Sequence, residues 1–114
     1  MVKRFEDLIA WQKARLLSVA IYKAFEDSKD YGFKDQIQRS SVSVMNNIAE
    51  GFERKTKKEF SYFLSIAKGS CGEVRSMLVL SKDLKKLSTE TADSLLQQAE
   101  EISKIIAGLM NSIK

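Results

Sequence analysis

Carboxylate and thiol side chains are the groups in this sequence whose chemistry could serve catalysis. Glu50 and Glu73 could act as an acid–base pair, and the single cysteine, Cys71, could act as a nucleophile or a metal ligand. The sequence contains no histidine, so a Cys-His dyad, a zinc site or a histidine-containing di-metal site cannot form within one chain. We expect no enzyme activity, no metal and no cofactor; catalysis by Glu50 or Glu73 is the rival interpretation.

Basic side chains offer a second kind of chemistry, the binding of phosphate groups. The densest basic run is Arg54-Lys55-Thr56-Lys57-Lys58. If four helices run up and down, the chain start, this run and the chain end meet at one pole, which we call the basic pole: Lys3, Arg4, Arg54, Lys55, Lys57, Lys58 and Lys114. This pole is the candidate nucleic-acid-binding site, because lysine and arginine clamp phosphates. A solvated turn is the alternative interpretation.

Acidic residues near the basic pole reduce its positive charge. The same end of the molecule holds Glu6, Asp7, Glu50, Glu53 and Glu59, and the whole chain has a net charge of only +4. A single bundle would therefore bind nucleic acid weakly. An oligomer that presents the pole several times would bind more tightly through multivalency.

Composition indicates one helical domain, residues 1–114. Hydrophobic residues make up 44% of the chain and charged residues 30%, and there are five glycines and no proline. Long stretches can therefore run as helix without a break. The sequence has no apolar run long enough to span a membrane and no secretory signal, and one cysteine cannot form an internal disulfide. The expected location is the cytoplasm.

Apolar periodicity predicts four helices, over about residues 6–27, 33–53, 57–86 and 90–113. The clearest stripe steps alternately by three and four positions, through Ala92, Leu95, Ala99, Ile102, Ile106, Leu109 and Ile113. In the first helix, Leu16 is expected to widen the apolar face. Thr56 with Glu59, and Ser88 or Thr89, are expected to cap the third and fourth helices. Short connections predict an all-α, antiparallel up-down-up-down four-helix bundle.

The third helix carries more apolar surface than one packed face needs. Its two apolar stripes, one of which includes Cys71, together cover an arc of roughly 200°, and we expect part of this arc to pack against another subunit. A helix set deep in its own bundle is the alternative interpretation. The thiol is expected to pack as a small hydrophobe. A further face has only small residues, and we expect another helix to approach it closely, within the chain or between chains: Ser61, Ser65, Gly69, Gly72 and Ser76. A break at the glycines is the structural alternative.

Several polar residues are expected inside the bundle. Arg39 precedes the turn near Lys55 by 16 residues and Glu73 follows it by 18, so the two charges should lie at similar height. We predict that they form a pair that fixes helix register. Asn47 and Glu50 are further candidates for polar contacts, within the chain or between subunits.

Particular motifs give the chain a resemblance to a known family. They are Phe5-Glu6-Asp7-Leu8 with Trp11, Ala14 and Tyr22; Gln36, Arg39 and Ser40; Asn47-Ile48-Ala49-Glu50-Gly51 with Arg54; and Phe60, Phe63, Leu64, Ala67, Gly69-Ser70 and Glu73. With these motifs the chain resembles the bacterial four-helix bundle proteins encoded within intervening sequences of 23S ribosomal RNA genes. It is also similar to the accessory proteins of diversity-generating retroelements, which share that fold.

The resemblance implies a homopentameric ring without enzyme activity of its own. The retroelement proteins bind nucleic acid and a reverse transcriptase through a basic surface, but this chain is less basic and fits the ribosomal-gene group better, which has no settled function. Two hypotheses follow. The chain is either an oligomer that binds RNA or DNA through its basic pole, or a protein–protein scaffold whose basic pole only keeps it in solution.

Overall fold

Local sequence signals set the helix boundaries in the computed structural model, which describes residues 2–114. A short 3-10 turn, η1 (Phe5–Asp7), precedes four α-helices: α1 (Ile9–Ala24), α2 (Tyr31–Glu53), α3 (Lys57–Asp83) and α4 (Thr89–Ser112). Within residues 2–114 there is no strand. The prediction of an all-α fold with four helices is confirmed.

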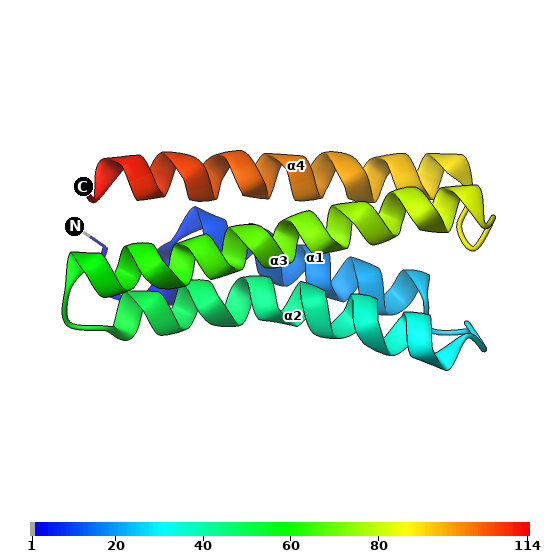
Figure 1. The fold of residues 1–114 in the computed structure, drawn as a ribbon, viewed down its shortest axis with the longest axis horizontal. Coiled ribbons are helices and arrows are strands. Elements are labelled where there is room, and N and C mark those ends of the chain that lie inside the picture. Colours follow the sequence, from blue (N-terminus) through cyan, green and yellow to red (C-terminus); the bar gives the residue numbers. More distant parts are fainter. Residues whose placement is uncertain (1) are drawn as a thin grey trace.

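The four helices form an antiparallel bundle with short connections (Figure 1). Each helix contacts the two that are its neighbours in the order α1, α2, α3, α4 and back to α1. The bundle measures 43 × 21 × 20 Å. The α2–α3 connection lies at the same end as both chain termini, and the other two connections lie at the opposite end (Figure 1). This up-down-up-down order is the one that the sequence predicts.

Caps and turns explain where the boundaries differ from the prediction. Residues 6–8 lie outside α1, because the chain first forms η1 and then becomes extended at Leu8. Helix α3 ends three residues early. There Lys85 adopts a left-handed φ of 58°, and the amide of Lys86 donates to the carbonyl of Ser81 at 2.9 Å. This hydrogen bond and the left-handed residue are those of a Schellman motif, which satisfies the last carbonyls of a helix.

Side-chain caps start α3 and α4 as predicted. The hydroxyl of Thr56 accepts from the amide of Glu59 at 3.1 Å, and the hydroxyl of Ser88 accepts from the amide of Thr91 at 3.1 Å. Each bond satisfies an amide that has no partner within its helix. Helix α3 runs without a break across Gly69 and Gly72, so the alternative of a broken third helix is wrong.

The apolar stripes of the four helices meet in one core. Five residues of the predicted α4 stripe are buried, and Leu109 and Ile113 pack half-buried at its end. Leu16 is the exception in α1: it is 56% exposed and points outward, so the prediction that it widens the buried face is wrong. The core consists of Ala10, Ala14, Leu17, Ile21, Phe25, Ile37, Val44, Ile48, Leu64, Ala67, Cys71, Val74, Leu78, Leu95, Ala99, Ile102 and Ile106.

Cys71 lies in this core and links α3 to α4. Its side chain is fully buried, and its Sγ donates to the carbonyl oxygen of Ala99 at 3.1 Å. Burial raises the pKa of the thiol above its ordinary value, because a thiolate would lose its hydration there. The cysteine therefore packs as a neutral small hydrophobe, as predicted.

An ion pair closes the end of the bundle opposite the termini. Asp30 caps α2 through a bond from the amide of Phe33 at 3.2 Å, and its second oxygen accepts from Nζ of Lys86 at 2.8 Å. The ammonium of Lys86 also lies 5.1 Å from the centre of the Phe33 ring. The bond from Lys86 lowers the pKa of Asp30. These contacts tie the α1–α2 connection to the α3–α4 connection.

Candidate nucleic-acid interface

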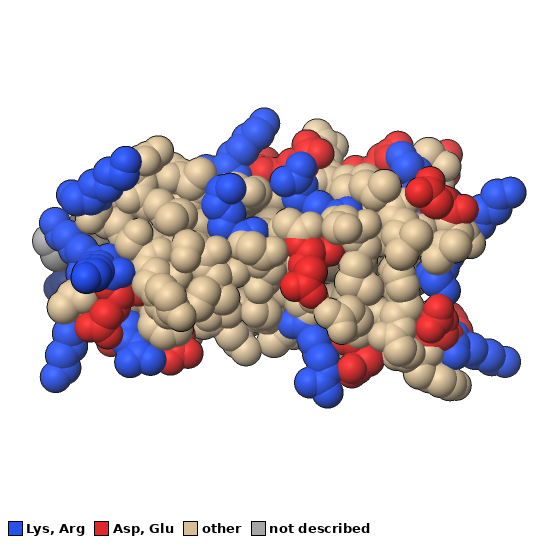
Figure 2. All heavy atoms as spheres, in the orientation of Figure 1, with Lys and Arg blue, Asp and Glu red and all other residues tan. Residues whose placement is uncertain are grey.

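The bundle topology brings the residues of the basic pole to one end of the molecule (Figure 1). Charged side chains crowd that end on the face shown in Figure 2, while a broad area over α3 and neighbouring α2 carries few charges. The pole thus forms from three separate parts of the chain. Only the tertiary structure joins the α2–α3 turn to residues near the two ends of the sequence.

Both arginines of the basic pole are engaged by neighbouring side chains. Arg4 forms an ion pair with Glu6 at 2.9 Å, and this hydrogen bond raises the pKa of Arg4 and lowers that of Glu6. Arg54 pairs with Glu50 at 2.7 Å and lies 4.0 Å from Glu59. Its guanidinium also lies 4.8 Å from the centre of the Phe63 ring. The two arginines therefore lie within ion-pair distance of three of the five nearby carboxylates, those of Glu6, Glu50 and Glu59.

The lysines of the basic pole are exposed and carry no such partner. Among residues 2–114, no ion pair involves any of these five side chains: Lys3, Lys55, Lys57, Lys58 and Lys114. A lysine without a carboxylate partner keeps its whole charge for an incoming phosphate. The structure therefore divides the predicted site into two anchored arginines and five available lysines.

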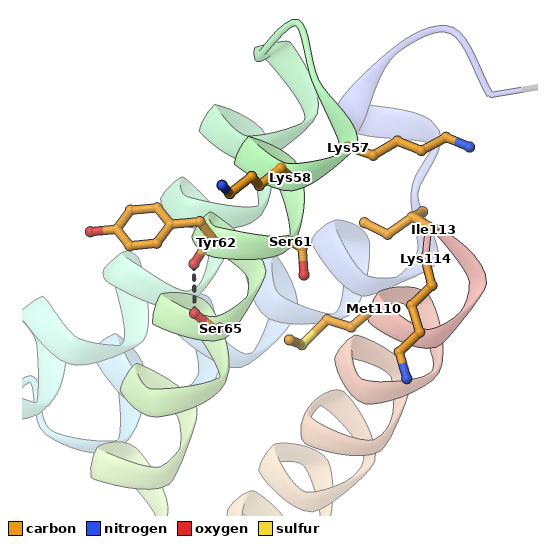
Figure 3. Close-up of a pocket in the computed structure, with 8 residues that line it drawn as sticks. All are labelled: Lys57, Lys58, Ser61, Tyr62, Ser65, Met110, Ile113 and Lys114. Atoms are coloured by element: carbon orange, nitrogen blue, oxygen red, sulfur yellow. Dashed lines mark hydrogen bonds between the residues drawn. The ribbon is translucent and has the colours of Figure 1, made fainter.

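A groove of about 470 Å³ lies between the start of α3 and the end of α4, beside Lys57, Lys58 and Lys114 (Figure 3). Met110 and Ile113 give it an apolar side, and Tyr62, which is 62% exposed, stands on the other edge. Besides these three, the described residues that line the groove are Lys57, Lys58, Ser61, Ser65 and Lys114. None of the eight is acidic. The groove combines positive charge with apolar surface.

Sequence reasoning missed the part that Tyr62, Met110 and Ile113 play in this groove. One available signal was the spacing of Lys58 and Tyr62, which places an aromatic ring one helical turn after the basic run. The contribution of α4 had no comparable signal. Its last turn reaches the groove only because α4 packs beside α3.

The predicted pair between Arg39 and Glu73 is wrong. Arg39 donates from Nε to the carboxylate of Asp35, one turn earlier in its own helix, at 2.7 Å. An oxygen of Glu73 instead accepts from Nε2 of Gln36 at 2.9 Å and from the hydroxyl of Ser40 at 3.1 Å. Arg39 and Glu73 do lie at a similar level along the bundle axis. The residues of α2 that face α3 at this level are Gln36 and Ser40, which lie four positions apart. Arg39 is turned away from α3.

Asn47 and Glu50 make their polar contacts within α2. The side-chain amide of Asn47 donates to the carbonyl and hydroxyl oxygens of Ser43, at 2.8 and 3.0 Å. The hydroxyls of Ser43 and Ser70 lie 2.9 Å apart and connect α2 to α3. Glu50 pairs with Arg54, as described above. Contacts of Asn47 or Glu50 with another subunit stay a prediction.

The small-residue face of α3 makes no close contact inside the chain. A Cβ atom added at Gly69 or Gly72 would meet nothing within 4 Å, and neighbouring Ser65 and Ser76 are exposed. The within-chain form of this prediction is therefore wrong, and a contact between chains stays a prediction. The close approach occurs instead at Gly51, where an added Cβ would lie 2.8 Å from Cβ of Phe63.

Membrane-spanning and metal-binding features are both absent from the described residues. No helix within residues 2–114 is both long and apolar enough to cross a membrane. Within the same range, no group of three acidic or cysteine side chains is arranged to hold a metal ion. Binding of anions by the basic pole is the chemistry that the arrangement offers.

Comparison with known families identifies the chain. A model of the 23S rRNA-intervening sequence protein family matches residues 6–108. The chain belongs to this family. The matched region of this 23S rRNA-intervening sequence protein includes the run from Arg54 to Lys58, whereas Lys3, Arg4 and Lys114 lie outside it.

A solved structure shares the fold of this 23S rRNA-intervening sequence protein. It is the crystal structure, at 1.70 Å, of a protein of unknown function from the S23 ribosomal protein family of Bacteroides thetaiotaomicron. The two chains are 24% identical, with a TM-score of 0.85, and the match covers 90% of this chain and 98% of the other. No curated protein matches the chain.

Proposed function

We propose that this 23S rRNA-intervening sequence protein is a non-enzymatic homo-oligomer that binds RNA or DNA through its basic pole. The observation that carries the proposal is the set of five exposed lysines at one end of the bundle, none of which pairs with a carboxylate within residues 2–114. Lysines in this state release counterions from nucleic acid when they contact phosphates.

Exposed apolar side chains support the oligomeric part of the proposal. Leu80 and Leu84, at the end of α3, are large apolar side chains that are 45% and 55% exposed. Leu16 on α1 is exposed as well. A second copy of the chain is the occupant we propose for part of this surface. The family resemblance suggests a pentameric ring, which would repeat the basic pole and strengthen binding.

The polar contacts support the non-enzymatic part. Glu50 is held by Arg54, and Glu73 by Gln36 and Ser40, so each carboxylate has a structural partner. The cysteine is buried and its pKa is raised, which disfavours the reactive thiolate.

A binding titration at two salt concentrations tests the proposed function. We expect the protein to bind fluorescently labelled oligouridine or a mixed-sequence RNA duplex. If three lysines of each chain contact a single strand, raising the salt from about 50 to 200 mM should weaken binding by roughly 20-fold. An affinity that does not change with salt would contradict a phosphate-based interface.

Charge-matched variants locate the interface. The triple variant Lys55→Glu, Lys57→Glu and Lys58→Glu should lose binding. The control has the same net charge, because it changes to glutamate three exposed lysines away from the basic pole that pair with no carboxylate within residues 2–114: Lys23, Lys29 and Lys68. It should bind nearly as the unchanged protein does. Equal loss in both variants would show that net charge alone governs binding, and no binding by the unchanged protein would favour the scaffold hypothesis.

A further inference from the structure

We propose that the groove beside the basic pole takes single-stranded nucleic acid, with one unstacked base lying against the ring of Tyr62. This inference rests on the proposed function and narrows it to one class of ligand. It follows from the position of one exposed aromatic ring among lysines that have no carboxylate partner.

Tyr62 presents an open aromatic surface. The side chain is 62% exposed, and among residues 2–114 the one ring in contact with it is Phe63. The two ring centres are 5.3 Å apart and the planes meet at 80°, which is an edge-to-face arrangement. Such a contact supports the tyrosine ring while a large part of it stays accessible. Every nucleic-acid base has a π face that can stack on such a ring.

One lysine lies beside this ring, and two more lie across α3 from it (Figure 3). Lys58 lies one turn before Tyr62 in α3, and Figure 3 shows its amino group on the same side of the helix as the tyrosine ring. Lys57 and Lys114 line the groove nearer to α4 (Figure 3). A strand with one base on Tyr62 would therefore meet Lys58 first and then, toward α4, Lys57 and Lys114 (Figure 3).

The apolar side of the groove distinguishes single strands from duplexes. Met110 and Ile113 offer hydrocarbon surface, which suits the face of a base or a ribose but not a phosphate. In a duplex the base faces are stacked inside the helix and cannot reach Tyr62. A duplex would contact only the lysines and would gain nothing from the ring or from the apolar side chains.

A neighbouring subunit need not cover this site. Ser61 and Ser65 line the groove and also belong to the small-residue face, so the inference requires that a contact between chains lies over Gly69, Gly72 and Ser76, at least seven residues along α3 from Tyr62. At 1.5 Å per residue this separation is about 10 Å.

Substitution of the tyrosine tests the inference. Tyr62→Ala should weaken the binding of oligouridine by about 5- to 150-fold, and Tyr62→Phe, which keeps the stacking surface, should bind as the unchanged protein does. Neither change should alter the affinity for a mixed-sequence RNA duplex. The matched control is Tyr31→Ala at the opposite pole, since Tyr31 is 70% exposed yet lies outside the groove; it should change neither affinity.

The outcomes separate this inference from the proposed function. Suppose that the unchanged protein binds nucleic acid, that the Lys55, Lys57, Lys58 triple variant does not, and that Tyr62→Ala binds oligouridine normally. That result would refute the stacking site and support the basic pole as the binding surface. Tighter binding of the duplex than of oligouridine would refute the stacking site in the same way. Binding of neither nucleic acid by the unchanged protein would overturn both proposals. Circular dichroism of each variant shows that the bundle is intact.

Discussion

Replacing Gly51 by alanine should destabilise the bundle, although the same exchange in a helix usually stabilises it. Gly51 lies in the last turn of α2, three residues before Arg54, and it is buried against α3. An added Cβ would lie 2.8 Å from Cβ of Phe63, 3.0 Å from Cδ1 of Phe60 and 3.2 Å from its carbonyl oxygen. The Cβ of Phe63 and the carbonyl oxygen of Phe60 cannot move away by a change of rotamer, because both are fixed to the backbone of α3. Helices α2 and α3 would therefore have to separate.

Two opposing terms give the size of this effect. Alanine is favoured over glycine in a helix by about 1 kcal/mol. Overpacking costs about 1–3 kcal/mol, and we expect the upper value because a rotamer change cannot relieve the contact with Cβ of Phe63. The net loss in the free energy of unfolding is then about 2 kcal/mol. For a domain of this size the melting temperature should fall by about 8 °C, at about 4 °C per kcal/mol.

Gly108→Ala provides the matched control, measured by thermal unfolding under circular dichroism. An added Cβ at Gly108, inside α4, would meet nothing within 4 Å. The alanine should therefore raise the melting temperature, by up to about 4 °C. A Gly51→Ala variant that melts at or above the temperature of the unchanged protein would refute the close contact between α2 and α3. The test also bears on the basic pole, because this contact sets where the run from Arg54 to Lys58 leaves α2.

Two further predictions concern the contacts of α3. A double-mutant cycle of Ser40→Ala with Glu73→Ala should give a coupling energy of about 1 kcal/mol. The stability losses of Arg39→Ala and Glu73→Ala should instead be additive. A larger coupling energy for Arg39 than for Ser40 would contradict the observed hydrogen bonds. Light scattering should give a mass of at least twice 12.9 kDa, and Gly69→Leu with Gly72→Leu should produce a smaller, later-eluting species. An unchanged elution volume with a raised melting temperature would show that nothing packs on this face.

The sequence by itself determined the fold class, because the spacing of apolar residues along the chain depends only on local sequence and indicates which segments form helices with one buried face. The four helices and most of their buried stripes follow from it, and so do the caps at Thr56 and Ser88. It also showed which residues could form the basic pole, since up-down topology with short connections leaves little choice about which ends meet.

Only the tertiary structure decided which side chains touch. Gln36 and Ser40, not Arg39, reach Glu73, because a rotation of about 100° per residue turns the neighbouring position away from α3. Gly51, and not Gly69 or Gly72, meets another helix within the chain, because close approach depends on where the axes of α2 and α3 converge. The groove at Tyr62 needs the last turn of α4 beside the first turns of α3, and no local pattern in either segment encodes that packing.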